Sequence, residues 1–227
     1  MSYLKTDQVD EALESFQTLL ETYPESRFRP YAVYEISVAY AAEGAHEKVV
    51  AYAKDLQRIP GREVEGLWML AESFRASGDF RNAIQLYTRI SHQHPDHPRA
   101  ADALYFRALL LVKRGDTAIS TEALVEFSRR FPKDPRAYSA LEQAGDLWVR
   151  KGKLQEGLDV WLLLLEQHSS ADLLLKIALL EIRLEKTSSA QNHLESFLEE
   201  DPEGVKRATA QYWLGVLHDQ EGEHLLA

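Results

Sequence analysis

Small and apolar residues recur along the chain at a nearly constant period. Seven positions that each follow an apolar helical stretch define the period, and they are 33 to 37 residues apart. Five of the seven are glycine. We call them pivot positions: Asp7, Gly44, Gly78, Gly115, Gly152, Glu185 and Gly222. Because glycines placed by chance would not keep this spacing, the pattern predicts a repeat architecture.

Other residue types keep the same register. Seven residues before the pivots stand small residues, namely Ser37, Ala71, Ala108, Gly145, Ala178 and Gly215. Twelve residues after them stand large apolar residues, namely Leu19, Leu56, Ile90, Phe127, Leu164 and Phe197. Seventeen residues after them stand helix-ending or turn residues, namely Pro24, Gly61, Pro95, Pro132, Ser169 and Pro202. The register predicts two antiparallel helices per repeat, in close contact at the small residues and ended by glycine and proline.

The best-defined repeat contains Leu67-Trp68-Met69-Leu70-Ala71, followed by Phe74, Gly78, Ala83, Tyr87 and Pro95. This order of bulky, small, aromatic, glycine, alanine, aromatic and proline residues resembles the tetratricopeptide repeat (TPR) family. The resemblance implies an all-α, right-handed superhelical solenoid of about six repeats. The repeats of this single array over 1–227 are expected at 1–24, 25–61, 62–95, 96–132, 133–169, 170–202 and 203–227. Since the first and last units are incomplete, we expect the chain to be a fragment of a longer protein.

In TPR arrays the first helix of each repeat lines a concave groove in which ligands lie as extended or helical peptides. The resemblance therefore implies groove residues on the helix face opposite the small packing residues. The candidates are Tyr31, Tyr34, Glu65, Trp68, Glu72, Arg75, Asp102, Tyr105, Glu142 and Asp146. Aromatic side chains with a polar rim anchor peptides well, because they bury a large area with few torsions to order. The same rings also suit a packing role between repeats, and both alternatives stay open.

Composition excludes several classes of function. The 227 residues carry 26 Lys+Arg against 36 Asp+Glu, a net charge of −10, which disfavours binding to a nucleic-acid backbone. The sequence has no cysteine, so disulfides, thiolate metal sites and cysteine nucleophiles are excluded. It also has no apolar run near the ~20 residues that a transmembrane helix needs.

Two segments contain residues with catalytic or metal-binding chemistry. His92, His94 and His97, with Asp96 among them, offer donors for zinc or nickel, but they lie on a predicted turn where polar residues are usual. His168-Ser169 has no nucleophile-elbow motif around it. We therefore assign no catalytic, cofactor or metal residue and expect no enzymatic activity, with metal binding at the histidine turn as an alternative.

The apolar run around Leu175, Leu179 and Ile182 exceeds what one buried helix face needs. Enclosure by neighbouring helices is the expected reason, and self-association is the alternative.

The sequence thus favours a non-catalytic protein–protein interaction scaffold that holds a peptide segment or partner helix in its groove. The turns at Tyr23-Pro24, His94-Pro95 and Phe131-Pro132 resemble those of bacterial cell-envelope TPR proteins. An alternative is therefore a structural subunit or adaptor of a bacterial envelope or secretion assembly. This resemblance favours a periplasmic or envelope-associated location, with a cytoplasmic one as the alternative.

Overall fold

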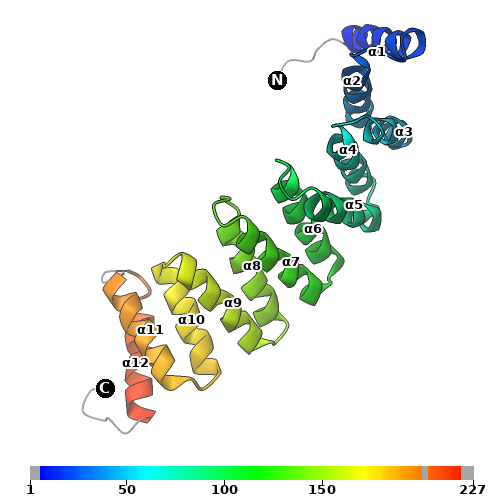
Figure 1. The fold of residues 1–227 in the computed structure, drawn as a ribbon. Helices are drawn as coiled ribbons and strands as arrows, with labels where there is room; N and C mark the ends of the chain where they lie inside the picture. Colours follow the sequence, from blue (N-terminus) through cyan, green and yellow to red (C-terminus); the bar gives the residue numbers. More distant parts are fainter. Residues whose placement is uncertain (1–5, 201–203, 221–227) are drawn as a thin grey trace. The chain divides into compact units, whose positions relative to one another are not determined.

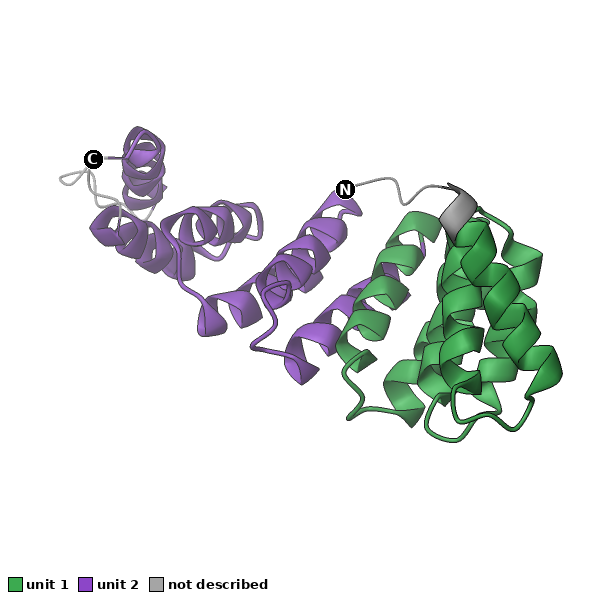
Figure 2. Ribbon diagram, turned by 90° about the horizontal axis from the view of Figure 1, so that it is seen from above, with its two compact units in different colours: residues 1–115 green, residues 116–227 purple. Residues whose placement is uncertain are grey.

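The structure, a computed structural model, describes residues 6–200 and 204–220 of the chain. These residues form twelve α-helices and no strand, which confirms the all-α prediction (Figure 1). The chain divides into two compact units, residues 1–115 and 116–227, coloured separately in Figure 2. The boundary follows Gly115, inside the predicted repeat 96–132. One continuous array over the whole chain stays a prediction.

The first unit contains six helices joined by turns of three to six residues, and each helix packs against the next one along the chain. They are α1 (Thr6–Thr22), α2 (Arg29–Ala42), α3 (His46–Gln57), α4 (Glu63–Ala76), α5 (Phe80–Gln93) and α6 (Ala100–Arg114). Short turns between packed helices make neighbours antiparallel. Leu67, Ala83, Tyr87 and Ile90 form the centre of a core that α4, α5 and α6 share.

The second unit repeats this arrangement of helices. It contains α7 (Thr117–Arg130), α8 (Ala137–Arg150), α9 (Leu154–Gln167), α10 (Ala171–Arg183), α11 (Thr187–Glu200) and α12 (Arg207–Gln220). Leu141, Leu158 and Leu164 are fully buried between α8, α9 and α10. Leu194 and Phe197 of α11 are fully buried against α10 and α12.

Most of the pivot positions form the turns that the sequence predicts. Gly44, Gly78, Gly115 and Gly152 adopt φ between 72° and 83°, and Glu185 adopts the left-handed φ of 57° without being glycine. The prediction for Asp7 is wrong, because Asp7 lies inside α1, which begins at Thr6. Gly222 and Pro202 lie outside the described residues. The described prolines of the register lie directly beyond their helices, for example Pro95 two residues after α5 ends at Gln93.

Most small residues of the register lie where two helices approach closely. Ser37, Ala71, Ala108 and Ala178 are fully buried. At Gly145 a Cβ atom would lie 2.2 Å from the indole of Trp161, so α8 approaches α9 more closely there than any larger residue allows.

The apolar run in α10 is enclosed in most of its positions. Leu173, Leu174, Leu175, Ile177 and Leu180 are buried. Leu179 and Ile182 are half-buried and pack against the core of α10, α11 and α12. This packing accounts for the apolar run, and self-association stays a prediction.

Within residues 6–200 and 204–220, none of the helices combines the length and the hydropathy that a membrane span needs.

Candidate functional site: a pocket between α2 and α4

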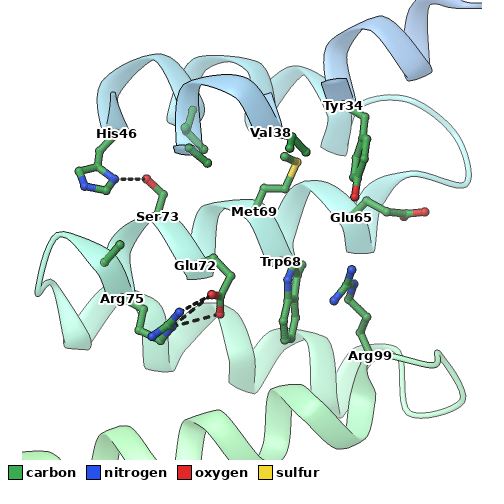
Figure 3. A pocket seen from close by; sticks show the side chains of 13 residues that line it. Tyr34, Val38, His46, Glu65, Trp68, Met69, Glu72, Ser73, Arg75 and Arg99 are labelled. Carbon is green, nitrogen blue, oxygen red and sulfur yellow. Dashed lines mark hydrogen bonds and ion pairs between the residues drawn. The ribbon is translucent and has the colours of Figure 1, made fainter. Parts of the chain in front are cut away.

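The first unit has a pocket of about 300 Å³ between α2 and α4, which we call the unit 1 pocket (Figure 3). Glu65, Trp68, Glu72 and Arg75 lie three or four residues apart in α4 and therefore share one face of that helix, which forms the long wall of the pocket. The pocket is also lined by Tyr34, Val38 and Ala41 of α2, His46 and Val49 of α3, Met69, Ser73 and Ala76 of α4, and Arg99.

The middle of the unit 1 pocket is apolar. Val38 is 42% exposed there and lies opposite Met69 in Figure 3. Trp68 is half-buried, and its ring lies 5.6 Å from that of Tyr87 and 5.9 Å from that of Phe106. Trp68 therefore packs on the core of the unit and lines the pocket at the same time. The two roles that the sequence left open are combined in this side chain.

Glu72 is the centre of a hydrogen-bonded network at one end of the pocket. Arg75 donates to Glu72 from Nη2 at 2.6 Å and from Nε at 3.2 Å, and the Tyr87 hydroxyl also donates to Glu72. Burial raises the pKa of Tyr87, and the hydrogen bond to Glu72 raises it further. The same carboxylate raises the pKa of Arg75. Glu72 and Arg75 thus neutralise each other and form a fixed polar wall.

Arg99 lies at the opposite end, directly before α6 (Figure 3). Its guanidinium carbon lies 4.4 Å from the centre of the Trp68 ring. Glu65, on the same side, pairs with Arg62 at 3.1 Å. The cation of Arg62 in turn lies 5.2 Å from the ring of Tyr31.

The pocket continues into a second, more open hollow beyond Arg99. Tyr34, Glu65 and Arg99 line both spaces, and the second hollow adds Arg62, His97, Pro98 and Asp102. We call the unit 1 pocket and this hollow together the trough. Its lining combines an apolar floor with charged and aromatic edges, as in the apolar centre and polar rim of protein interfaces.

Inside the unit 1 pocket, His46 and Ser73 contact each other, with 3.2 Å between Nδ1 and Oγ. Among the described residues, no carboxylate contacts the other nitrogen of His46, so this pair lacks the third member of a nucleophilic triad. The contact connects the start of α3 to α4.

Comparison with known families identifies the repeat. A model described as "Tetratricopeptide repeat" matches residues 69–118, 107–172 and 175–227, and a second one with the same description matches residues 1–26. The matches cover more than half of the sequence. The chain belongs to the tetratricopeptide repeat family. A comparison with curated protein sequences finds no significant match.

Solved structures share the fold of this TPR chain at low sequence identity. The structure of Naa15/Naa10 bound to HypK-THB aligns with a TM-score of 0.64 and 14% identity, over 97% of this chain and 33% of that chain. A crystal structure of MamA aligns with a TM-score of 0.53 and 17% identity, over 73% of this chain and 96% of that chain. MamA from Desulfovibrio magneticus RS-1 aligns with a TM-score of 0.48 and 16% identity, over 78% of this chain and 97% of that chain. Such identities establish the fold alone.

The eight predicted groove residues that belong to the first unit fall into three groups. Tyr34, Glu65, Trp68, Glu72 and Arg75 line the unit 1 pocket, and Asp102 lines the adjoining hollow. Tyr31 is exposed beside Arg62, at the edge of the trough. Tyr105 is half-buried next to Phe106 and is not among the residues that line the trough.

Glu142 and Asp146 belong to the second unit. Lys176 of α10 pairs with Glu142 at 2.9 Å and with Asp146 at 3.2 Å. Burial lowers the pKa of Lys176, but the two carboxylates outweigh this effect and raise it. The two acids are therefore engaged by a lysine of their own unit, which the sequence pattern did not indicate.

The three histidines of the turn contact separate partners. His92 contacts the carbonyl of Thr88 at 3.0 Å, His94 lies 3.8 Å from Glu63, and His97 accepts a hydrogen bond from the Arg99 N–H at 3.2 Å. Within the described part of the chain, no three metal-binding side chains are grouped as a metal ion requires. The described contacts give no support to metal binding through His92, His94 and His97, and this alternative stays a prediction.

The His168-Ser169 pair is likewise divided between separate partners. Ser169 donates to Glu200 at 2.6 Å, and the His168 ring lies 5.8 Å from that of Tyr138.

Sequence reasoning missed the apolar floor and one charged residue of the trough. Val38, Met69 and Arg99 were not among the candidates. A signal for Arg99 exists, because the position sixteen residues before the pivot is also basic in neighbouring repeats, at Arg62 and Arg136.

Proposed function

We propose that the TPR chain is a non-catalytic interaction scaffold whose first unit binds a segment of a partner protein in the trough. TPR proteins are protein–protein interaction scaffolds, and the chain belongs to this family. The observation that carries the proposal is the unit 1 pocket, because it combines a partly exposed apolar floor with an aromatic ring already fixed by the core.

The volume of the pocket, about 300 Å³, suits one or two side chains of a peptide and leaves the rest of the segment on the open trough. Trp68 is held against Tyr87 and Phe106, so little side-chain entropy is lost when a ligand contacts it. The hydrogen bonds of Glu72 fix the polar wall before binding in the same way. A preformed site of this kind binds an extended or helical segment without rearrangement.

The experiment begins with 12-residue random peptides displayed on phage and selected on the immobilised full chain. The selected peptides are then synthesised with a fluorescent label, and their binding is measured by anisotropy. We expect Val38→Glu to abolish binding, because it places a charge on the apolar floor. The melting temperature should stay unchanged, because Val38 is partly exposed.

Ile119→Glu is the matched control, since Ile119 is 51% exposed on α7 of the second unit. It should leave binding unchanged. Selection of no peptide, or binding that Val38→Glu leaves intact, contradicts the proposed function.

A further inference from the structure

The residue directly before the helix is arginine at three of the predicted first helices: Arg62 before α4, Arg99 before α6 and Arg136 before α8. Arg62 pairs with Glu65 at 3.1 Å, and Arg136 pairs with Asp134 at 2.7 Å. Among the described residues, no carboxylate lies within ion-pair distance of Arg99, whose guanidinium stacks on Trp68 instead. Within the described part of the chain, Arg99 is therefore the only one of these three arginines without a counterion.

The turn before α6 explains this difference. In three turns the residue three positions before the first residue of the helix accepts a hydrogen bond from a backbone N–H. Ser26 accepts from Phe28 at 3.2 Å, His97 from Arg99 at 3.2 Å, and Asp134 from Arg136 at 2.9 Å. Asp134 also binds the guanidinium of Arg136, at 2.8 and 2.7 Å. His97 satisfies the backbone in the same way but supplies no negative charge, so the guanidinium of Arg99 keeps its donors for a ligand.

Arg99 lies where a bound segment would pass. It lines both parts of the trough, and the Trp68 ring covers one face of its guanidinium. A stacked guanidinium keeps the N–H donors at its edge for a carboxylate. The surrounding unit is nearly neutral, because residues 1–115 carry 14 basic and 16 acidic residues, whereas residues 116–227 carry 12 and 20.

We propose that Arg99 binds the carboxylate of an aspartate or glutamate side chain inside the partner segment. The trough then recognises an acidic residue close to the apolar residue that occupies the Val38 and Met69 floor. The hollow continues beyond Arg99, so a bound chain passes this residue, and an internal side chain fits better than a chain terminus.

This inference rests on the proposed function, and its test uses peptides selected on the full chain. Two 12-residue libraries are compared, one inserted within the display protein and one ending in a free carboxylate. Each acidic residue of a selected peptide is then replaced by its amide. We expect one such replacement to weaken binding about tenfold or more, the usual value of a charge-assisted hydrogen bond. Since this change is made in the peptide, it does not affect folding of the chain.

Variants of the chain complete the test. Arg99→Gln should weaken binding about tenfold or more, and the amide replacement in the peptide should then have no further effect. His97→Asp should weaken binding similarly, because the new carboxylate would hold Arg99 as Asp134 holds Arg136. His97→Ser reproduces the uncharged hydrogen bond that Ser26 accepts at the equivalent turn. This variant should bind the peptide with an affinity within about twofold of wild type. Arg81→Gln, an exposed charge on α5, is the control for net charge.

Three outcomes overturn the inference. In the first, Val38→Glu abolishes binding, but Arg99→Gln and the amide replacements in the peptide do not change it. The proposed function then holds and the inference about Arg99 fails. In the second, binding requires a free carboxyl terminus or a phosphate group, which gives Arg99 a different ligand. In the third, no peptide is selected, and the proposed function fails together with the inference.

Discussion

The Tyr87 hydroxyl, which belongs to the buried core of α5, donates a hydrogen bond to Glu72 on the wall of the unit 1 pocket. This bond links the core of the first unit directly to its binding surface. A change at Glu72 therefore acts on stability as well as on the pocket.

Glu72→Ala should lower the free energy of unfolding by about 1–3 kcal/mol, because it leaves the buried Tyr87 hydroxyl without an acceptor. Urea unfolding measures the effect. In the Glu72→Ala background, Tyr87→Phe should cost less than it does in the wild type, since the hydroxyl no longer has a partner. Equal costs of Tyr87→Phe in both backgrounds would show that the two residues are not coupled.

Two glycines at the same position of the repeat should respond in opposite ways to alanine. A Cβ at Gly145 would lie 2.2 Å from Trp161, whereas one at Gly215 meets nothing within 4 Å. Gly145→Ala should destabilise the chain by about 1–3 kcal/mol through overpacking. Gly215→Ala should stabilise α12 by up to about 1 kcal/mol, because alanine has the higher helix propensity. Thermal unfolding of both variants checks the pair, and a stabilising Gly145→Ala argues against the tight α8–α9 contact.

Glu185 should be a position where glycine raises stability. Its φ of 57° is left-handed, which costs a residue with a side chain about 1–2 kcal/mol relative to glycine. Glu185→Gly should therefore raise the free energy of unfolding by about 1 kcal/mol. At the equivalent turn, Gly152→Ala should lower it by a similar amount, since Gly152 has φ of 77°. Loss of stability in Glu185→Gly contradicts this account of the turn.

The repeat, the helix pairs and the turns were predictable, because glycine, proline and small residues at fixed spacing report directly on backbone geometry. Five of the ten candidate residues line the unit 1 pocket, and four of them share the face of α4 that helical periodicity indicates. Periodicity does not report which charges pair. The engagement of Glu142 and Asp146 by Lys176, and the contrast between Arg99 and Arg136, depend on side-chain contacts that the spacing does not encode.

Asp134 should make the free energy of unfolding of the second unit depend on pH. The hydrogen bond from Arg136 lowers the pKa of Asp134 against the opposing effect of burial. The resulting stabilisation is present above the unfolded pKa of about 3.9 and is lost as pH falls through the lower pKa of the folded state. Asp134→Asn should therefore cost about 1 kcal/mol at neutral pH and little once the wild-type carboxylate is protonated. Urea unfolding at neutral and strongly acidic pH tests the sign.

Glu156→Gln is the control for Asp134, because the Glu156 pair with Lys153 is exposed, at 3.5 Å. It should change stability little at any pH. If Asp134→Asn lowered the free energy of unfolding more as the pH falls, the ionised carboxylate of Asp134 would not be the stabilising form.

The most direct test of the central claim uses the indole N–H signals of the four tryptophans during titration with a selected peptide. Trp68 lines the unit 1 pocket, whereas Trp148, Trp161 and Trp213 belong to the second unit. We predict that the Trp68 signal shifts with the peptide concentration and that the other three stay in place. Shifts at Trp148, Trp161 or Trp213 with an unchanged Trp68 signal would contradict a binding site in the trough of the first unit.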